Sequence, residues 1–492
     1  MARTLVSSVA LLVALLPATP AAAQYISLKT VPVAAGDQFL VFPSQNLGMG
    51  GVSIALDDDW LDPFVNPAKG SRIGESRFFA LPTHYSMSQN AGSATTLTAG
   101  GLFGGKAFGG GMVALQQLKS GEQFFGPVPL RDIAILPPNA LSQQSATNKY
   151  AFLMLGSEVG PGFTVGVSAF FSDLNGIDGV EHLYALSRDI DESGSSQDVR
   201  LGMTKALGDG SVLEATALYN RFDATHVVTY VDWVLVDSVT WQWEEQARVE
   251  TNADKTNTWG LHLGFRRPVG AHGWRVGGTL TGNYKSHPKI PNYEIVNIPR
   301  DPGHSTALDI GLGVAKQQGA TTFGMDIVYE PAWSSTWAEA AGPVPTVGGD
   351  TIPSGGRTVE NEFRFSNAQV RMGVQQQVGP AAFQAGLELR AYDYHLDQWD
   401  NVTDEFRRQD EQWMEWTPTW GARVRFPGFE VRYVGRVTTG TGRPGIAWTG
   451  IVAERAADAG FANDIVVPPG GPLTLQEVHV WTHQLSVAVP IR

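Results

Sequence analysis

The stretch AQVRMGVQQQVGPAAFQAGLELRA, residues 368–391, decides the fold class. Apolar and polar residues alternate with a period of two on both sides of the Gly379-Pro380 pair. Because successive side chains of a strand point to opposite faces, each half has one apolar and one polar face. If Gly379-Pro380 is a two-residue turn, Arg371 lies opposite Glu388 on the polar face, which stabilises an antiparallel pairing. The stretch therefore predicts two long antiparallel strands.

The same period of two continues from Ser76 to the C-terminus. The predicted strands start near residues 76, 93, 106, 148, 162, 198, 211, 256, 273, 306, 320, 367, 381, 415, 429 and 477. Short connections, such as Pro427-Gly428, alternate with long ones, such as 119–147 and 332–366. Short turns at one end and long loops at the other are typical of bacterial outer-membrane barrels, and strands of about 10 to 13 residues cross a bilayer when tilted. We therefore predict an all-β fold, a transmembrane antiparallel β-barrel of about 14–16 strands.

The N-terminus and the composition indicate export. Residues 1–23 combine Arg3, an apolar run from Leu5 to Leu16 and a final Ala21-Ala22-Ala23, which is the pattern of a signal peptide. The formal net charge of -13 argues against a nucleic-acid partner, and the absence of cysteine excludes disulfides and Cys-based metal sites. We expect a protein of the bacterial outer membrane that contacts lipid and the barrel-assembly machinery. Its oligomeric state stays open.

The stretch NLGMGGVSIALDDDWLDPFVNPAKG, residues 46–70, comes directly before the first predicted strand. Its glycine-rich start, acidic centre and closing N-P-A resemble the FadL superfamily of outer-membrane proteins, which includes fatty acid and hydrocarbon transporters and PorV-type secretion components. The matching residues are Gly48, Gly50, Gly51, Ala55, Asp58, Asp59, Phe64, Asn66, Pro67 and Ala68. The chain departs from the family pattern at Lys69, where the motif commonly has glycine, and at its C-terminus, which lacks the usual terminal aromatic residue.

The resemblance implies a three-part chain: a signal peptide (1–23), an N-terminal plug in the lumen (24–75) and the barrel (76–492). It implies a passive transport channel for hydrophobic small molecules, fatty-acid-like or hydrocarbon, that is gated by the plug. The alternative is a PorV-like component of a protein secretion or surface-attachment system. The expected gating residues are Gly48, Gly50, Gly51, Asp58, Asp59, Phe64, Asn66 and Pro67. We expect no enzyme activity and no cofactor, since no metalloprotease, P-loop or dinucleotide motif is present.

Several arginines fall on the polar faces of the predicted strands. The candidates for ligand binding in the lumen are Arg371, Arg390, Arg423 and Arg432. They suit an anionic headgroup such as a carboxylate, but acidic residues are interleaved with them, so a charge-paired lumen wall is the alternative. The register places Arg423 opposite Arg432, the one inward pair without obvious neutralisation.

Two further features allow more than one interpretation. Asp57-Asp58-Asp59 suits a cation site or, since the carboxylates lack the spacing of a Ca²⁺ loop, a helix cap or turn. The loops are rich in tryptophan, which suits either a surface that collects apolar ligands or packing between the loops.

The strand-like run 227–243 predicts a hairpin that extends beyond the membrane.

Overall fold

The computed structural model describes residues 29, 32–121, 141, 143–182, 187–237, 239–270, 272–287, 302–340, 342–444 and 475–491. The predicted signal peptide and parts of the loops 119–147, 285–305 and 439–476 lie outside these residues.

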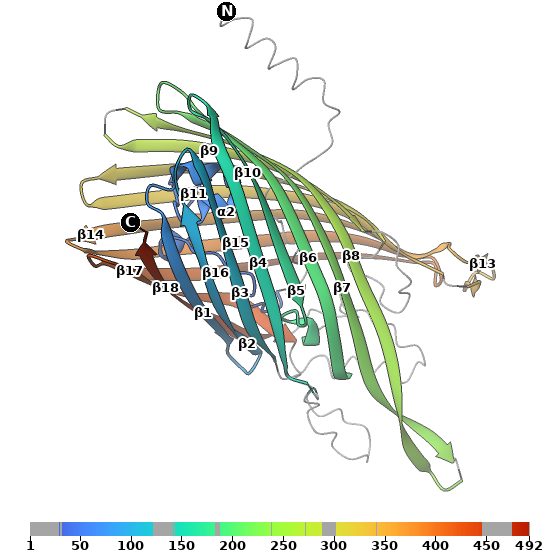
Figure 1. Ribbon diagram of the computed structural model, residues 1–492. Coiled ribbons are helices and arrows are strands. Elements are labelled where there is room, and N and C mark those ends of the chain that lie inside the picture. The colour runs from blue at the N-terminus through green and yellow to red at the C-terminus, as the bar shows by residue number, and fades with distance from the viewer. Residues whose placement is uncertain are drawn as a thin grey trace, which may run out of the picture.

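The described residues form a closed antiparallel barrel of 16 strands, in which β1 pairs with β18 (Figure 1). The barrel strands are β1 (Arg77–Met87), β2 (Gly92–Phe103), β3 (Ala107–Ser120), β4 (Ser145–Gly160), β5 (Phe163–Leu174), β6 (Ser187–Ala206), β7 (Val212–Asp237), β8 (Gln242–Val269), β9 (Trp274–His287), β10 (Gly303–Gln318), β11 (Thr321–Glu339), β14 (Arg357–Val378), β15 (Ala381–Asp400), β16 (Glu405–Arg425), β17 (Glu430–Pro444) and β18 (Leu475–Pro490). The predicted fold is confirmed at the upper limit of the expected strand number.

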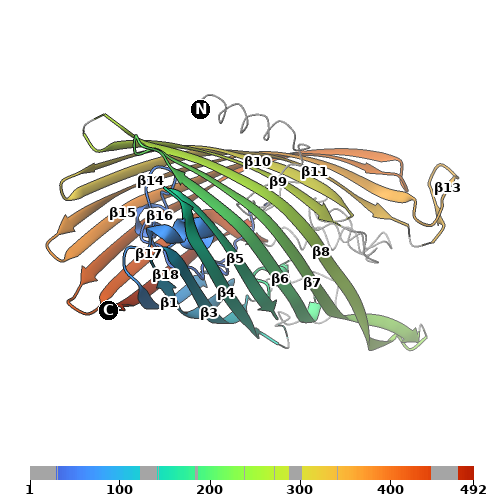
Figure 2. The same cartoon turned by 45° about the horizontal axis from the view of Figure 1, so that its top comes forward.

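Two short strands, β12 (Val344–Pro345) and β13 (Thr351–Ile352), form a separate hairpin in the loop between β11 and β14. The longest barrel strands, β7 and β8, contain 26 and 28 residues and extend past their neighbours as a hairpin (Figures 1 and 2). The hairpin predicted at 227–243 is therefore present, since β7 and β8 pair through it.

The pairing register agrees with the sequence pattern. Val378 pairs with Ala381 across the Gly379-Pro380 turn, and Arg371 pairs with Glu388. At the next turn of this kind, Arg425 pairs with Glu430. A slip by one residue would place these charges on the apolar face, so the hydrophobic pattern fixes the register.

The outer face of the barrel is an apolar belt. Large exposed side chains include Leu97, Val113, Leu153, Ile327 and Leu312, the last of them 67% exposed. At the short-turn end of the barrel, the rings of Phe426 and Phe429 stack on this face with centroids 4.5 Å apart. An apolar band edged by aromatic residues is the surface that an outer-membrane-type barrel presents to lipid. None of the helices in the described part of the chain is long and apolar enough to cross a membrane.

The N-terminal segment lies inside the barrel (Figure 2). It contains three short helical elements: η1 (Leu47–Met49), α2 (Asp62–Val65) and η2 (Pro67–Arg72). The helix α2 ends at Asn66, whose backbone is extended because a residue before proline disfavours the helical conformation. The described part of the segment before β1, residues 29 and 32–76, is called the plug below.

An aromatic core joins the plug to the wall. Trp60 and Phe64 of the plug are each 2% exposed and pack against Phe79 of β1. Phe64 also packs on Phe152 of β4, with ring centroids 4.8 Å apart. The side of the lumen formed by β1–β5 therefore holds the plug by apolar burial, which is non-directional and grows with the area removed from water.

Candidate functional site

The acidic triplet of the plug comes directly before the helix α2. The carboxylate of Asp58 accepts hydrogen bonds from the backbone N–H groups of Trp60 and Leu61 at 3.1 and 2.9 Å. It also accepts bonds from the N–H groups of Gln45 and Asn46 at 2.9 and 3.1 Å. Asp58 therefore closes the turn that precedes α2 and ties it to the preceding loop, as the turn interpretation predicted, but the turn is buried and Asp58 is not the N-cap of α2, which is Leu61.

The glycine-rich part of the plug sits directly on the wall. The turn at η1 closes through a bond from Gly51 N–H to the Asn46 carbonyl, and Gly50 and Gly51 both have positive φ, at 71° and 74°. A Cβ at Gly386 of β15 would overlap the backbone nitrogen of Gly50. The hydroxyl of Thr419 on β16 accepts from Gly50 N–H at 2.9 Å. Glycine on both sides is what permits this approach of two backbones.

A second contact runs through Asp326 of β11. Its carboxylate accepts from the N–H groups of Ser53 and Ile54 in the plug, at 2.8 and 3.3 Å. The guanidinium of Arg371 lies 3.1 Å from the same oxygen. Arg371, a predicted ligand-binding residue, thus neutralises an aspartate that holds the plug.

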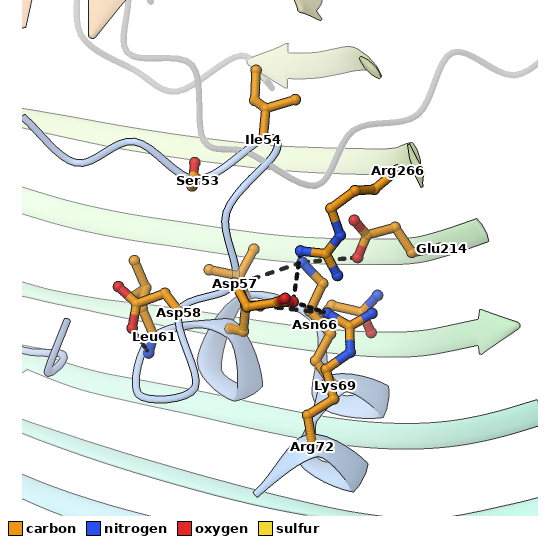
Figure 3. Close-up of polar contacts among 12 residues, drawn as sticks. Ser53, Ile54, Asp57, Asp58, Leu61, Asn66, Lys69, Arg72, Glu214 and Arg266 are labelled. Atoms are coloured by element: carbon orange, nitrogen blue, oxygen red, sulfur yellow. Dashed lines mark hydrogen bonds and ion pairs between the residues drawn. The ribbon is translucent and has the colours of Figure 1, made fainter. Parts of the chain in front are cut away.

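Charged side chains attach the other half of the plug to β7, β8 and β9 (Figure 3). The carboxylate of Asp57 lies 2.6 Å from Arg266 and 3.0 Å from Arg275, both on the wall, and 2.9 Å from Arg72 in the plug. Burial raises the pKa of Asp57, but these three arginines outweigh burial and hold the pKa below its usual value. The pairs thus join the plug to the wall by charge.

The most buried of these pairs is formed by Lys69. Its ammonium lies 2.8 Å from Glu214 on β7 and 3.5 Å from Asp62 in α2. Burial lowers the pKa of Lys69, but Asp62 and Glu214 outweigh it and the net pKa is raised. Burial raises the pKa of Asp62 to about 6 although Lys69 opposes the change. Lys69 therefore stays charged while Asp62 titrates near neutrality.

The closing N-P-A of the motif lies against β5 and β6, away from the glycines of the motif, which sit on β15 and β16. The side chain of Asn66 accepts from Ala68 N–H at 3.1 Å and starts η2, and Pro67 approaches Gly166 of β5. Asp59 lies next to Asp57 and Asp58 in the chain, and burial together with their charges raises its pKa.

Arg432 corrects one expectation from the sequence. Arg423 does pair with Arg432 across β16 and β17, as predicted. However, Arg432 forms an ion pair with Glu430 on its own strand, and its guanidinium lies 4.4 Å from the ring centroid of Trp60. The pair is therefore neutralised on one side and covered by the plug, because side chains two apart on a strand share a face.

The remaining candidate arginines also have partners. Arg423 donates to the side-chain oxygen of Gln377 at 2.5 Å, and Arg390 lies 2.7 Å from Glu388.

The loop tryptophans divide into two groups, since Trp241 is 68% exposed whereas Trp413 packs on Tyr392 inside the barrel.

Sequence reasoning missed the partners of Lys69, which stood out only as a departure from the motif. The inward-facing arginines of the wall, Arg266 and Arg275, were candidate partners of the acidic triplet, and both pair with Asp57. The sequence pattern places Glu214 and Arg266 on the lumen-facing side of two adjacent strands. Because the plug also carries acidic and basic residues, this placement indicated that ion pairs could form between them.

Comparison with known proteins adds a likeness of fold. No protein-family profile and no curated protein matches the chain. Among solved structures, a Pseudomonas aeruginosa FadL homologue is 10% identical with a TM-score of 0.45, covering 93% of this chain and 100% of its own. FadL-type barrels are thus among the proteins that this chain resembles.

Two further structures share this likeness. The Ralstonia pickettii toluene transporter TbuX is 10% identical with a TM-score of 0.39, covering 92% of this chain and 99% of its own. The Escherichia coli K12 ferric-catecholate import receptor Fiu is 8% identical with a TM-score of 0.36, covering 84% of this chain and 82% of its own.

Proposed function

We propose that this protein is a passive channel of the bacterial outer membrane for hydrophobic small molecules and that its N-terminal segment, residues 24–75, gates it. The closed barrel and its apolar outer belt support the membrane location. The motif of residues 46–70 supports the transport of fatty-acid-like or hydrocarbon ligands, by its resemblance to FadL proteins.

The observation that carries the gating proposal is the unequal attachment of the plug. On the β1–β5 side, aromatic rings hold it by apolar burial. On the β7–β9 side, Lys69 and Asp57 hold it through ion pairs to Glu214, Arg266 and Arg275. A buried ion pair contributes little net stability when intact, but loss of one partner is costly. Such a contact suits a part of the plug that detaches and returns.

The long-loop half of the lumen has side chains that suit a hydrophobic ligand. Inward-facing side chains of β14, β15 and β16 form an apolar cluster in the long-loop half of the barrel. Its members are Phe363, Phe365, Tyr394 and Leu396, with Trp413 packed against them. Binding sites for small molecules are mostly apolar with a few polar groups. Arg390 is the candidate for an anionic group, since its side chain is 49% exposed while that of Arg432 is 7% exposed.

The test compares the full mature chain with a variant that lacks residues 24–75, each in planar bilayers and in proteoliposomes. We expect low ion conductance for the full chain and a large, steady conductance for the deletion variant. The full chain should admit a fluorescent long-chain fatty acid faster than protein-free liposomes do, and it should exclude a sugar of similar size. Equal conductance of the two proteins would rule out gating by the plug. Uptake no faster than through lipid alone would rule out the transport function.

A further inference from the structure

Two carboxylates and an amide lie side by side on the lumen wall of β10, β11 and β14. The register of β10 and β11 places Asp309 opposite Glu330, and Glu330 pairs with Asn367 of β14. Asp309 and Glu330 alternate with the lipid-facing residues Ile310 and Tyr329, so their side chains point into the lumen. We call Asp309, Glu330 and Asn367 the acidic row.

The acidic row lies between the plug and the apolar cluster of the long-loop half. Two residues from Asp309 along β10, Gly311 approaches Ile54 of the plug. In the other direction, each residue of the row has a member of the apolar cluster two positions away on its own strand. These members are Ala307, Ala332 and Phe365. Since residues two apart on a strand share a face, the row forms a polar floor beneath the apolar cluster.

The two carboxylates of the row have no cation of their own. Asp309 is 3% exposed, and within the described residues no basic side chain lies at ion-pair distance from it or from Glu330. Arg371 and Arg390, whose charges act on the row, are already paired with other carboxylates at 3.1 and 2.7 Å. Burial of an unpaired carboxylate is unfavourable, so the row has an unmet demand for positive charge.

Asn367 adds a third acceptor to the row. It is 2% exposed, and its side-chain oxygen has no hydrogen-bond partner among the residues that the structure describes. Buried polar atoms are nearly always hydrogen-bonded in native proteins. The free oxygen of Asn367 therefore suits a donor that a ligand supplies.

A primary ammonium group matches these acceptors better than a metal ion does. It carries one positive charge and three N–H donors, as the lysine side chain does. Calcium takes about six to eight oxygen ligands, more than the row offers. In the described part of the chain, no three or more acidic or histidine side chains are grouped to hold a metal ion. An alkyl chain on the ammonium group would lie against the apolar cluster.

We propose that the acidic row binds the ammonium group of a hydrophobic amine whose chain packs on the apolar cluster. The inference rests on the proposed transport function and names a further class of ligand for the same lumen. Charge-assisted hydrogen bonds to Asp309 and Glu330 select the amine over an alcohol of equal length, and their negative charge disfavours a carboxylate.

The test measures the binding of radiolabelled octylamine, octanol and octanoate to the full mature chain in phosphatidylcholine nanodiscs, with empty nanodiscs subtracted. At pH 7 the amine is protonated, as a lysine side chain is. We expect octylamine to bind about tenfold more tightly than octanol, because hydrogen bonds to charged groups contribute more than neutral ones. Octanoate should bind no more tightly than octanol.

The deciding variant combines Asp309→Asn with Glu330→Gln, which keeps the shape of both side chains and removes their charge. In it the preference for octylamine over octanol should vanish. The matched control is Glu362→Gln, an exposed position of β14, which should keep the full preference. If the double variant fails to fold, as judged by heat-modifiable mobility on gels, Asn367→Leu decides, with a several-fold weaker preference expected.

Three outcomes overturn the proposal. They are equal binding of octylamine and octanol by the native chain, a preference that survives in the double variant, and displacement of octylamine by calcium chloride at equal concentration, which would make the row a metal site. The fatty acid uptake test separates this inference from the proposed function. Selective binding of octylamine without uptake would keep the site and reject transport, and uptake without selective binding would do the reverse.

Discussion

The ammonium of Lys69 in the plug lies 2.8 Å from the carboxylate of Glu214 on the barrel wall. Both side chains are about nine-tenths buried, and the same lysine also contacts Asp62 in α2. One pair of residues thus links the N-P-A motif of the plug to strand β7.

Replacing Glu214 by Gln should loosen this half of the plug. The change leaves the Lys69 charge buried with Asp62 as its remaining partner, and breaking a buried pair costs about 3 kcal/mol. We expect faster hydrogen exchange in residues 57–72 and more frequent opening events in single-channel recordings. The control is Glu405→Gln, an exposed position at the end of β16, which should leave both quantities unchanged. Equal exchange in the two variants would show that the pair does not hold the plug.

Asp62 should make plug opening depend on pH. Burial raises its pKa to about 6 in the seated plug, whereas a released plug has the ordinary value near 3.8. The seated state therefore binds the extra proton, and its stability increases as the pH falls through 6. The pKa of Asp57 is lowered, so that residue stays ionised throughout this range.

We expect the plug to open less often as the pH falls from about 6 to about 4, and more often as it rises again. The Asp62→Asn variant should lose the dependence. A wild-type opening frequency that rises on acidification would contradict the assignment.

Alanine at Gly386 should disturb the seat of the plug on β15. The new methyl group would overlap the Gly50 nitrogen, and overpacking of this kind costs about 1–3 kcal/mol. We expect a raised basal conductance in planar bilayers. Heat-modifiable mobility on gels should show that the barrel is intact. Gly278→Ala serves as control, because a Cβ there meets its neighbours only at 3.7 Å or more. The prediction fails if the two alanine variants conduct equally.

A loop beside the plug should also respond to pH. Burial raises the pKa of Asp178 to about 7 and that of Glu181, in the short helix η3 (Val180–His182), to about 8. Asp178 accepts a hydrogen bond from Gly36 N–H of the plug, and Glu181 accepts one from Gly121 N–H at 2.6 Å. The other charged groups near this contact are Asp37 and Glu192, with the Tyr85 hydroxyl also close.

Because burial in the docked state raises the pKa of Asp178 from 3.8 to about 7, the docked state loses stability as the pH rises from about 4 to 7. Hydrogen exchange of residues 34–38 should therefore increase across this interval. In the Asp178→Asn variant the increase should be smaller. Exchange that slows with rising pH, after correction for its intrinsic pH dependence, would refute the prediction.

The sequence predicted the barrel well because the wall is a local, periodic structure. The alternation in 368–391 and the two-residue turn at Gly379-Pro380 together fix the face and the register of β14 and β15. The C-terminus also behaves as a strand, since β18 pairs with β1 despite the missing terminal aromatic residue. Each of these features is readable within about twenty residues.

Contacts between the plug and the wall could not be predicted in this way. Lys69 meets Glu214 and Lys29 meets Glu415 across long stretches of chain, and no local period relates these positions. The left-handed backbone of Gly440 and the register shift beside it in β17 were equally hidden. Nothing in the sequence distinguishes this residue from the other glycines among the 56. Pairing between distant segments needs the closed barrel as a frame, and only the three-dimensional structure supplies it.

The order of the segments along the chain has a consequence for assembly. The plug runs through the lumen from Val33, beside β17 in the long-loop half, to Ile73, beside the β2–β3 turn, and it is followed at once by β1. The wall is completed only when β18, the last strand, joins β1. A finished cylinder would have to be threaded by this segment, whereas an open sheet can curl around it. We therefore expect the barrel to close around the segment as the final step of assembly.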